Sequence, residues 1–179
     1  MKRKSRTGRS RTSDRAKPVH DAKPLGEKPD AKKTVTRKTA EEYELTTKRR
    51  GELSELAFVF KAASLGFHVS KPYGDSERYD FILDAGPRLW RIQIKSTTTL
   101  MCGLYRINSH RRTSYGTVPY QPSEIDFLIA HVIPEDTWFI LPIALIQHRT
   151  SVLFPPRRHP RQRALFAAYR EAWHLLREP

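Results

Sequence analysis

The chain has 179 residues, a formal net charge of +14 and a pI near 10.2, a length that suits one domain with an appendage. No stretch approaches the ~20 apolar residues of a membrane span, and no apolar h-region of a secretory signal is present, so we expect no membrane association. The single cysteine excludes an internal disulfide and a cysteine-cluster zinc site, and it fits a cytoplasmic protein.

The first part of the chain is a basic arm. Residues 1–50 hold 17 of the 33 lysines and arginines but only 7 of the 19 acidic residues, and the first 42 residues contain no Phe, Trp or Tyr. Such a segment buries too little apolar area to offset its chain entropy, so we predict a disordered arm over residues 1–45 and a folded domain over residues 46–179. The arm either contacts a polyanion such as nucleic acid or is a solvated tail that aids solubility.

The folded domain is predicted to begin with a helix over residues 50–65, closed by Gly66. The apolar positions that recur with helical spacing predict a core-facing stripe made of Leu53, Leu56, Ala57, Phe60 and Ser64. Glu55 has Phe58, Val59 and Ala62 at its i+3, i+4 and i+7 positions, so we expect it on a partly apolar face.

Strand patterns follow the helix, and an amphipathic pattern closes the chain. Extended segments are predicted at residues 67–70, 79–84, 89–94, 100–107, 125–133 and 138–143, with a turn at 85–88. Cys102 falls inside one of them and is predicted to be an inert buried thiol. Residues 110–124 are predicted to be irregular, and residues 161–177 a final helix with a stripe at Leu165, Ala168, Tyr169, Ala172 and Leu176. Together they predict an α/β or α+β domain with a mixed sheet flanked by helices.

Four polar residues can converge at one end of the hairpin over residues 79–95. Asp80 starts one strand, Gln93 and Lys95 lie two residues apart on the other, and Glu55 lies on the preceding helix. Cleavage of a phosphodiester needs a divalent metal and a cation that orients the nucleophile. Mg²⁺ prefers oxygen ligands, which the two carboxylates, the Gln93 side chain and the backbone carbonyl of Ile94 could supply. Taken singly, Asp80 could simply end a strand and Lys95 could protect a sheet edge.

These residues resemble the PD-(D/E)xK nuclease superfamily, and residues 47–146 are most similar to its group I intron-associated, homing-type endonucleases. The resemblance implies a restriction-endonuclease-like αβββαβ core and Mg²⁺- or Mn²⁺-dependent hydrolysis of DNA. It also implies roles for particular residues: Asp80 and Glu55 as metal ligands, Gln93 completing the shell, and Lys95 assisting the attacking water. Glu52, three residues before Glu55, is the alternative helix ligand.

The sequence departs from the superfamily pattern at two positions. Tyr79 replaces the proline of the motif, which contributes no ligand, and Gln93 replaces the acidic residue. A neutral amide binds a divalent ion less strongly than a carboxylate, so this site is expected to have a lowered metal affinity. The substitution keeps a second hypothesis open, namely a non-catalytic DNA- or RNA-binding protein that retains the nuclease fold. A third is a basic module that associates with RNA or ribosomes.

Further residues are candidates for contact with nucleic acid. Arg78 flanks the motif and Ser96 directly follows Lys95, while Arg111, Arg112 and Tyr115 interleave basic and aromatic side chains in one loop. Each of these also has a structural explanation. Arg78 could form a salt bridge within its turn, Ser96 could belong to a stretch chosen for strand propensity, and the loop residues could simply be solvated. Superfamily members that cut both strands often act as dimers or tetramers, so a homo-oligomer is an alternative to a monomer.

Overall fold

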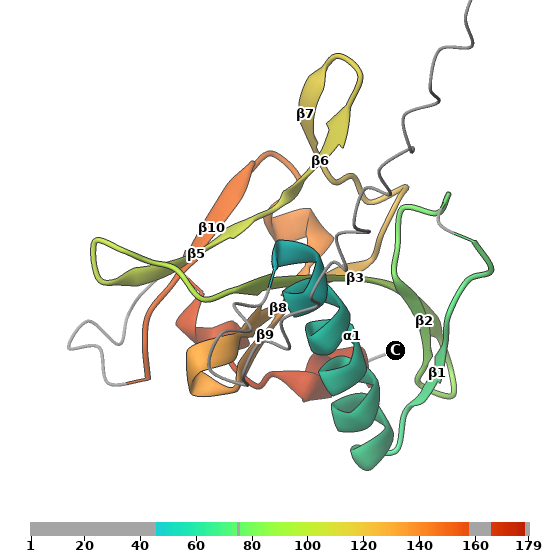
Figure 1. The fold of residues 1–179 in the computed structure, drawn as a ribbon. Coiled ribbons are helices and arrows are strands. Elements are labelled where there is room, and N and C mark those ends of the chain that lie inside the picture. The colour runs from blue at the N-terminus through green and yellow to red at the C-terminus, as the bar shows by residue number, and fades with distance from the viewer. Residues whose placement is uncertain (1–45, 75, 158–165, 178–179) are drawn as a thin grey trace, which may run out of the picture. The chain divides into compact units, whose positions relative to one another are not determined.

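The computed structural model describes residues 46–74, 76–157 and 166–177, so the predicted basic arm lies outside the described residues (Figure 1). The elements are α1 (Thr47–Ser64), β1 (His68–Ser70), β2 (Phe81–Asp84), β3 (Leu89–Thr97), β4 (Leu100–Met101), β5 (Leu104–Asn108), β6 (His110–Thr113), β7 (Gly116–Pro119), β8 (Phe127–Val132), η2 (Ile133–Glu135), β9 (Thr137–Pro142), η3 (Ile143–Leu145), β10 (Ser151–Phe154), η4 (Ala167–Tyr169) and η5 (Trp173–Leu176). Within these residues, no helix is long and apolar enough to cross a membrane.

Both ends of α1 are set by local capping. The Thr46 hydroxyl accepts a hydrogen bond from the backbone N–H of Arg49 at 3.2 Å, which starts the helix three residues earlier than predicted. At the other end, Gly66 adopts a φ of +83° and the N–H of Phe67 bonds to the carbonyl of Ala62 at 3.1 Å. The predicted helix and its closure at Gly66 are confirmed.

The face that α1 buries is not the predicted one. Leu56 and Phe60 are 63% and 78% exposed, so the predicted stripe of Leu53, Leu56, Ala57, Phe60 and Ser64 is wrong. The buried residues are instead Ser54, Phe58 and Ala62. Phe58 packs among Phe81, Trp138 and Trp173, with ring centroids 5.4–6.3 Å away, and this aromatic cluster selects the face. Glu55 therefore lies beside the buried face and not on the outer one.

A five-stranded mixed sheet forms the centre, in the order β1-β2-β3-β8-β9. β3 and β8 are parallel, from Ile92 opposite Phe127 to Thr97 opposite Val132, and the other pairs are antiparallel. The predicted strands at residues 67–70, 79–84, 89–94, 125–133 and 138–143 are confirmed within a few residues at their ends. β3 continues three residues further than predicted, to Thr97.

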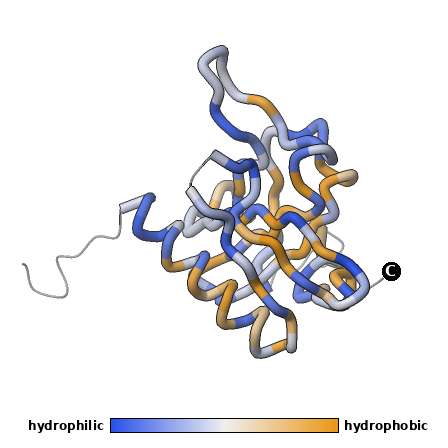
Figure 2. Tube along the Cα trace, turned by 90° about the vertical axis from the view of Figure 1, so that its right-hand side faces the viewer, coloured by the Kyte–Doolittle hydropathy of each residue, from blue (hydrophilic) through white to orange (hydrophobic). Residues whose placement is uncertain are grey.

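Strand β8, which lies between β3 and β9, is buried on both faces, and its side chains alternate between two cores. Phe127 and Ile129 join a cluster with α1 and with Trp173 of the carboxyl-terminal turns, while Leu128, Ala130 and Val132 join a cluster with β5 and β10. In Figure 2 the β6–β7 hairpin projects at the top and is pale to blue over most of its length, with one hydrophobic segment, and hydrophobic residues are frequent in the body below it.

The layer on the second face of the sheet is made of strands. The expected α+β fold with a mixed sheet is confirmed, but residues 98–126 form β4 to β7 and contain no helix. The predicted strand over residues 100–107 is a hairpin that turns at Cys102 and Gly103, whose φ values are +50° and +77°. Cys102 is exposed, so the predicted buried thiol is wrong. The segment predicted to be irregular contains the regular hairpin β6–β7.

The described carboxyl-terminal residues do not form the predicted helix. Residues 166–177 consist of the short 3₁₀ turns η4 and η5, separated by Glu171 at a φ of +50°. The Glu171 carboxylate accepts a hydrogen bond from the N–H of Trp138 at 2.8 Å, and Trp173 and Leu176 pack into the core beneath α1. These contacts with the edge strand β9 take the place of the backbone hydrogen bonds that a helix would form. Leu165 and the residues just before it lie outside the described residues.

Candidate active site

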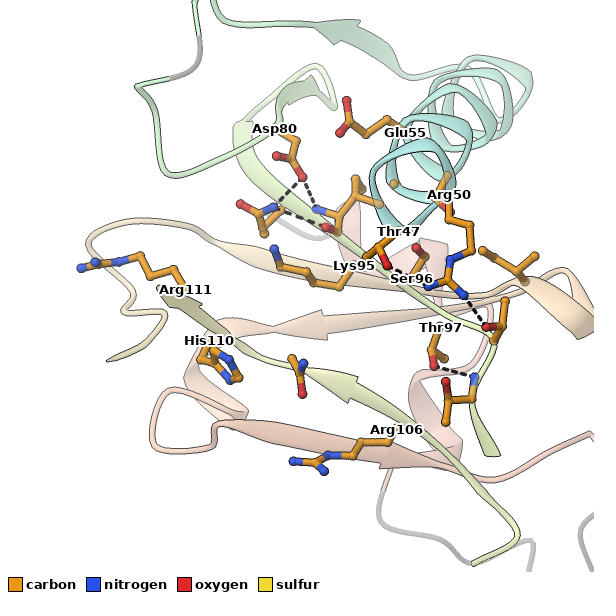
Figure 3. Close-up of a pocket in the computed structure, with 18 of the residues that line it drawn as sticks. Thr47, Arg50, Glu55, Asp80, Lys95, Ser96, Thr97, Arg106, His110 and Arg111 are labelled. Atoms are coloured by element: carbon orange, nitrogen blue, oxygen red, sulfur yellow. Dashed lines mark hydrogen bonds between the residues drawn. The ribbon is translucent and has the colours of Figure 1, made fainter. Parts of the chain in front are cut away.

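A polar groove with a volume of about 610 Å³ lies beside the start of α1 and the second half of β3 (Figure 3). Its lining comes from α1, β3, the β5–β6 region and the segments around them: Thr47, Arg50, Gly51, Ser54, Glu55, Asp80, Gln93, Ile94, Lys95, Ser96, Thr97, Thr98, Thr99, Arg106, Asn108, His110, Arg111, Arg112, Tyr120 and Ile133. All four predicted catalytic residues are among them. Their convergence in one groove agrees with the prediction from the hairpin.

Asp80 lies where the pairing of β2 with β3 ends. Its backbone N–H still bonds to the carbonyl of Ile92 at 2.8 Å, but beyond this point β3 has no strand on its β2 side. The Asp80 carboxylate occupies the position that a neighbouring strand would have there. Its Oδ2 accepts hydrogen bonds from the Ile94 N–H at 2.7 Å and from the Gln93 amide Nε2 at 2.6 Å (Figure 3). A backbone donor on the open strand edge thus fixes the carboxylate.

The pKa of Asp80 is raised above its usual value. Burial is the largest cause, and the nearby charge of Glu55 adds to it. The Ile94 N–H, the Lys95 ammonium and the Gln93 amide act in the opposite direction, but they do not fully compensate. Burial therefore disfavours the ionised form of this carboxylate, despite the nearby Lys95 ammonium.

The structure distinguishes between the two candidate acids on α1. Glu55 lines the groove, and its Oε2 forms an ion pair with Lys71 Nζ at 2.8 Å. Glu52 pairs instead with Arg49 at 3.2 Å and is not part of the groove lining. The geometry favours Glu55 as the helix ligand. Lys71 was not foreseen, because its position opposite Glu55 depends on how the helix packs against β1.

Gln93 and Lys95 share one face of β3, as their spacing predicts, because the residues on either side, Ile92 and Ile94, belong to the core under α1. Gln93 is 6% exposed, and its NH₂ group, not its oxygen, faces the Asp80 carboxylate. The Lys95 ammonium lies 5.6 Å from the centre of the Tyr120 ring. The Tyr120 ring therefore offers the ammonium a weak cation–π contact inside the groove.

The predicted nucleic-acid contacts divide into two groups. Ser96, Arg111 and Arg112 line the groove, although Arg111 is held by Glu124 at 2.7 Å. Arg78 and Tyr115 are exposed outside the groove lining, and Tyr115 lies in the turn of the β6–β7 hairpin. Sequence reasoning missed Arg50, Arg106 and His110, which reach the groove only through tertiary packing.

The donor set fits a hard divalent cation. Within the described residues, Asp80 Oδ1 and Glu55 Oε1 accept no hydrogen bond, so each acid keeps one oxygen for a ligand. The same residues contain no cluster of three or more His, Cys, Asp or Glu side chains suited to a metal ion. Two carboxylates that each keep one free oxygen therefore suit an ion that retains several water ligands, as Mg²⁺ does.

His131 is a buried titratable residue behind the groove. Its ring stacks on Trp138 at 3.9 Å, and its two nitrogens contact Ser54 Oγ at 3.1 Å and Asp136 Oδ1 at 3.4 Å. Burial is the largest cause of its pKa lying below the usual value of 6.5, although Asp136 raises it. The fold therefore favours the neutral ring.

This preference predicts an acid sensitivity of the fold. Because the unfolded chain protonates first, stability is lost as the pH falls below about 6.5, by at most about 1.4 kcal/mol per pH unit. We expect the His131→Gln variant, which is neutral at every pH, to lose less stability than the wild type between about pH 7.5 and pH 5.5. Urea unfolding at several pH values measures this difference. Equal losses in both proteins would contradict it.

The comparisons with known proteins agree with this geometry. The sequence model described as PD-(D/E)XK endonuclease matches residues 45–176. Among solved structures, the chain is similar to a bacterial homing endonuclease, I-Ssp6803I, with 26% sequence identity and a TM-score of 0.66, covering 74% of this chain and 94% of that one. No curated protein matches the sequence. Since the family match includes nearly all of the described residues and the whole groove, the chain belongs to the PD-(D/E)XK endonuclease family.

Proposed function

We propose that this endonuclease hydrolyses DNA phosphodiester bonds at the groove, using a divalent metal held by Asp80 and Glu55. The observation that carries the proposal is the arrangement of Asp80, whose carboxylate is fixed by the Ile94 N–H and Gln93 while one oxygen stays free for a ligand. Glu55 and Lys95 line the same groove. Metal-assisted phosphodiester hydrolysis uses this combination of acids and a cation.

The residues divide the work as follows. Asp80 and Glu55 would hold the metal through their free oxygens, and Gln93 and the backbone carbonyl of Ile94 would complete its surroundings. A bound Mg²⁺ or Mn²⁺ would neutralise charge on the scissile phosphate and help to ionise a water. Lys95 orients the attacking water with its ammonium group. Gln93 also keeps the Asp80 carboxylate in its orientation through the bond from its amide.

DNA is the substrate that the chain's charge and its relatives favour. The net charge of +14 suits a polyanion, and the similar solved structure is that of a homing endonuclease. A homing-type specificity, a cytoplasmic location and assembly into a homo-oligomer are parts of the same proposal.

The proposal is tested by metal-dependent nicking of supercoiled plasmid. We expect cleavage with Mg²⁺ and none with EDTA, and a loss of about 10²–10⁴-fold in the Lys95→Ala variant, because proton transfer and water orientation contribute on this scale. Lys61→Ala is the control, since this lysine lies in the last turn of α1 and contacts Glu171 at 3.8 Å, away from the groove. Undiminished cleavage by Lys95→Ala would contradict the assigned role.

A second candidate function is DNA binding without cleavage. It is favoured by Gln93, because this residue replaces the acid of the family motif and directs its NH₂ group at Asp80. A neutral amide adds no charge to a cation site that has only two carboxylates. Retained DNA binding with no Mg²⁺-dependent nicking by the wild type would establish this alternative.

A further inference from the structure

We infer that the groove contains a second phosphate site, in which Arg50, together with Arg106, binds a backbone phosphate of DNA within roughly four nucleotides of the one that is cut. The proposal rests on the proposed function for the identity of the polymer and for the place of the cut. It adds that the strand runs along β3, from Asp80 towards the residues around Thr98.

The first step is the fixed position of the Arg50 guanidinium. Its Nη1 donates to the Thr98 hydroxyl at 2.8 Å and its Nη2 to the Thr47 hydroxyl at 3.1 Å. A guanidinium carries five N–H donors, so three are left for another ligand. A cation held in one orientation by two hydroxyls loses little entropy when it binds a phosphate.

The second step is the charge around this end of the groove. The backbone N–H of Arg106 bonds to the Thr99 carbonyl at 3.4 Å, one residue beyond the Thr98 that Arg50 contacts, and the Arg106 side chain lines the same groove. Among the residues that the structure describes, no carboxylate lies within 4.0 Å of Arg50, Arg106 or Arg112, whereas Arg49 and Arg111 are each paired. These cations line the groove without an internal counter-ion and so attract an anion.

The third step is the glycine next to Arg50. Gly51 lies inside α1, where glycine is less favourable than alanine by about 1 kcal/mol. It is not among the residues with positive φ, and a Cβ placed on it would meet no described atom within 4 Å. Neither backbone strain nor packing explains the glycine. It lines the groove, where the missing side chain leaves room for a bound strand.

The fourth step is the distance from the proposed cut. Ile94, which bonds to Asp80, and Thr98, which bonds to Arg50, are four residues apart on and just beyond β3. At about 3.3 Å per residue this is about 13 Å. One strand of B-DNA advances about 3.4 Å per nucleotide along its axis, so the second phosphate lies within roughly four nucleotides of the cut. The starting turn of α1, which carries no acidic residue, faces the same space with its positive dipole end.

Salt-dependent DNA binding tests this site without cleavage. The full chain is titrated in EDTA against a fluorescent random-sequence duplex of about 30 base pairs, at several salt concentrations. We expect Arg50→Gln to lower the slope of log K against log salt by about 0.9, the value for one phosphate contact. Arg49→Gln is the matched control, because Arg49 is the preceding residue and pairs with Glu52 outside the groove. The basic arm is present in both variants and cancels in the comparison.

A second variant separates contact from folding. Gly51→Leu is expected to raise the midpoint of thermal unfolding, because leucine favours the helix, and to weaken DNA binding at least tenfold, because its side chain fills the groove. Equal salt slopes for Arg50→Gln and Arg49→Gln, or unchanged binding by Gly51→Leu, would overturn the second phosphate site. Because binding is measured in EDTA, a wild type that binds but does not cut contradicts the proposed function and leaves this test intact.

Discussion

Replacing Asp80 by asparagine is expected to lower Mg²⁺-dependent DNA cleavage by about 10²–10³-fold, the cost of removing one preorganised polar group from an active site. Asparagine keeps an oxygen that can accept the Ile94 N–H, which Asp80 now accepts at 2.7 Å, but it has no charge with which to hold a metal. We expect the free energy of unfolding not to decrease. Because burial raises the pKa of Asp80, a neutral side chain is at least as well accommodated as the carboxylate.

The measurement combines plasmid nicking with urea unfolding of the same protein preparation. Asp84→Asn is the matched control, since Asp84 ends the same strand and accepts a hydrogen bond from Gly86 N–H at 2.8 Å outside the groove. The control should cleave like the wild type. Cleavage by Asp80→Asn at the wild-type rate, with both proteins folded, would remove Asp80 from the proposed metal site.

The second large effect is expected from Gln93→Glu, which restores an acidic residue at this position. In EDTA the new carboxylate faces the Asp80 carboxylate, where the amide now donates at 2.6 Å. Replacing a buried donor by an acceptor is expected to cost about 1–3 kcal/mol of unfolding free energy. Mg²⁺ should reverse this loss, because a third carboxylate strengthens binding to the folded state.

Urea unfolding with EDTA and with increasing Mg²⁺ measures both parts of this prediction. Above saturation of the site, each tenfold increase in Mg²⁺ adds up to about 1.4 kcal/mol to the free energy of unfolding. The free energy of unfolding of Gln93→Glu should begin to rise at a lower Mg²⁺ concentration than that of the wild type. A variant as stable as the wild type in EDTA, with the same response to Mg²⁺, would show that Gln93 is not near the metal.

The residues of the hairpin were predictable because the contacts that place them are local. The turn at residues 85–88, in which Gly86 has a φ of +90°, pairs β2 with β3 and sets their register. That register places Phe81 opposite Ile92, so the preceding residue, Asp80, lies within reach of Gln93 and Ile94. The predicted convergence of these side chains needed no knowledge of the rest of the fold.

The buried face of α1 and the course of the carboxyl terminus depended on distant residues. α1 carries apolar side chains on two faces, and the choice between them is made by Trp138 and Trp173, which follow it by some eighty residues or more. The last segment has a helical pattern, but its pairing with β9 through Glu171 outweighs that preference. Neither the composition nor the periodicity of the sequence predicts either contact.

Two cations escaped prediction for the same reason: Arg50, which lines the groove, and Lys71, which pairs with Glu55. Their partners Thr98 and Glu55 lie 48 and 16 residues away. The packing of α1 against β3 and β1 brings each pair together. For this kind of site, sequence reasoning recovers the acids of the hairpin more readily than the basic side chains around them.

The early end of the pairing between β2 and β3 has a consequence for how the site assembles. Since the open edge of β3 is completed by α1 and by the β5–β6 region, the groove exists only when segments far apart in the chain have docked. An isolated hairpin of residues 79–95 would hold its acid and lysine without a binding pocket. Nuclease competence should therefore arise in the last, cooperative stage of folding, so that a partly folded chain cannot cut DNA.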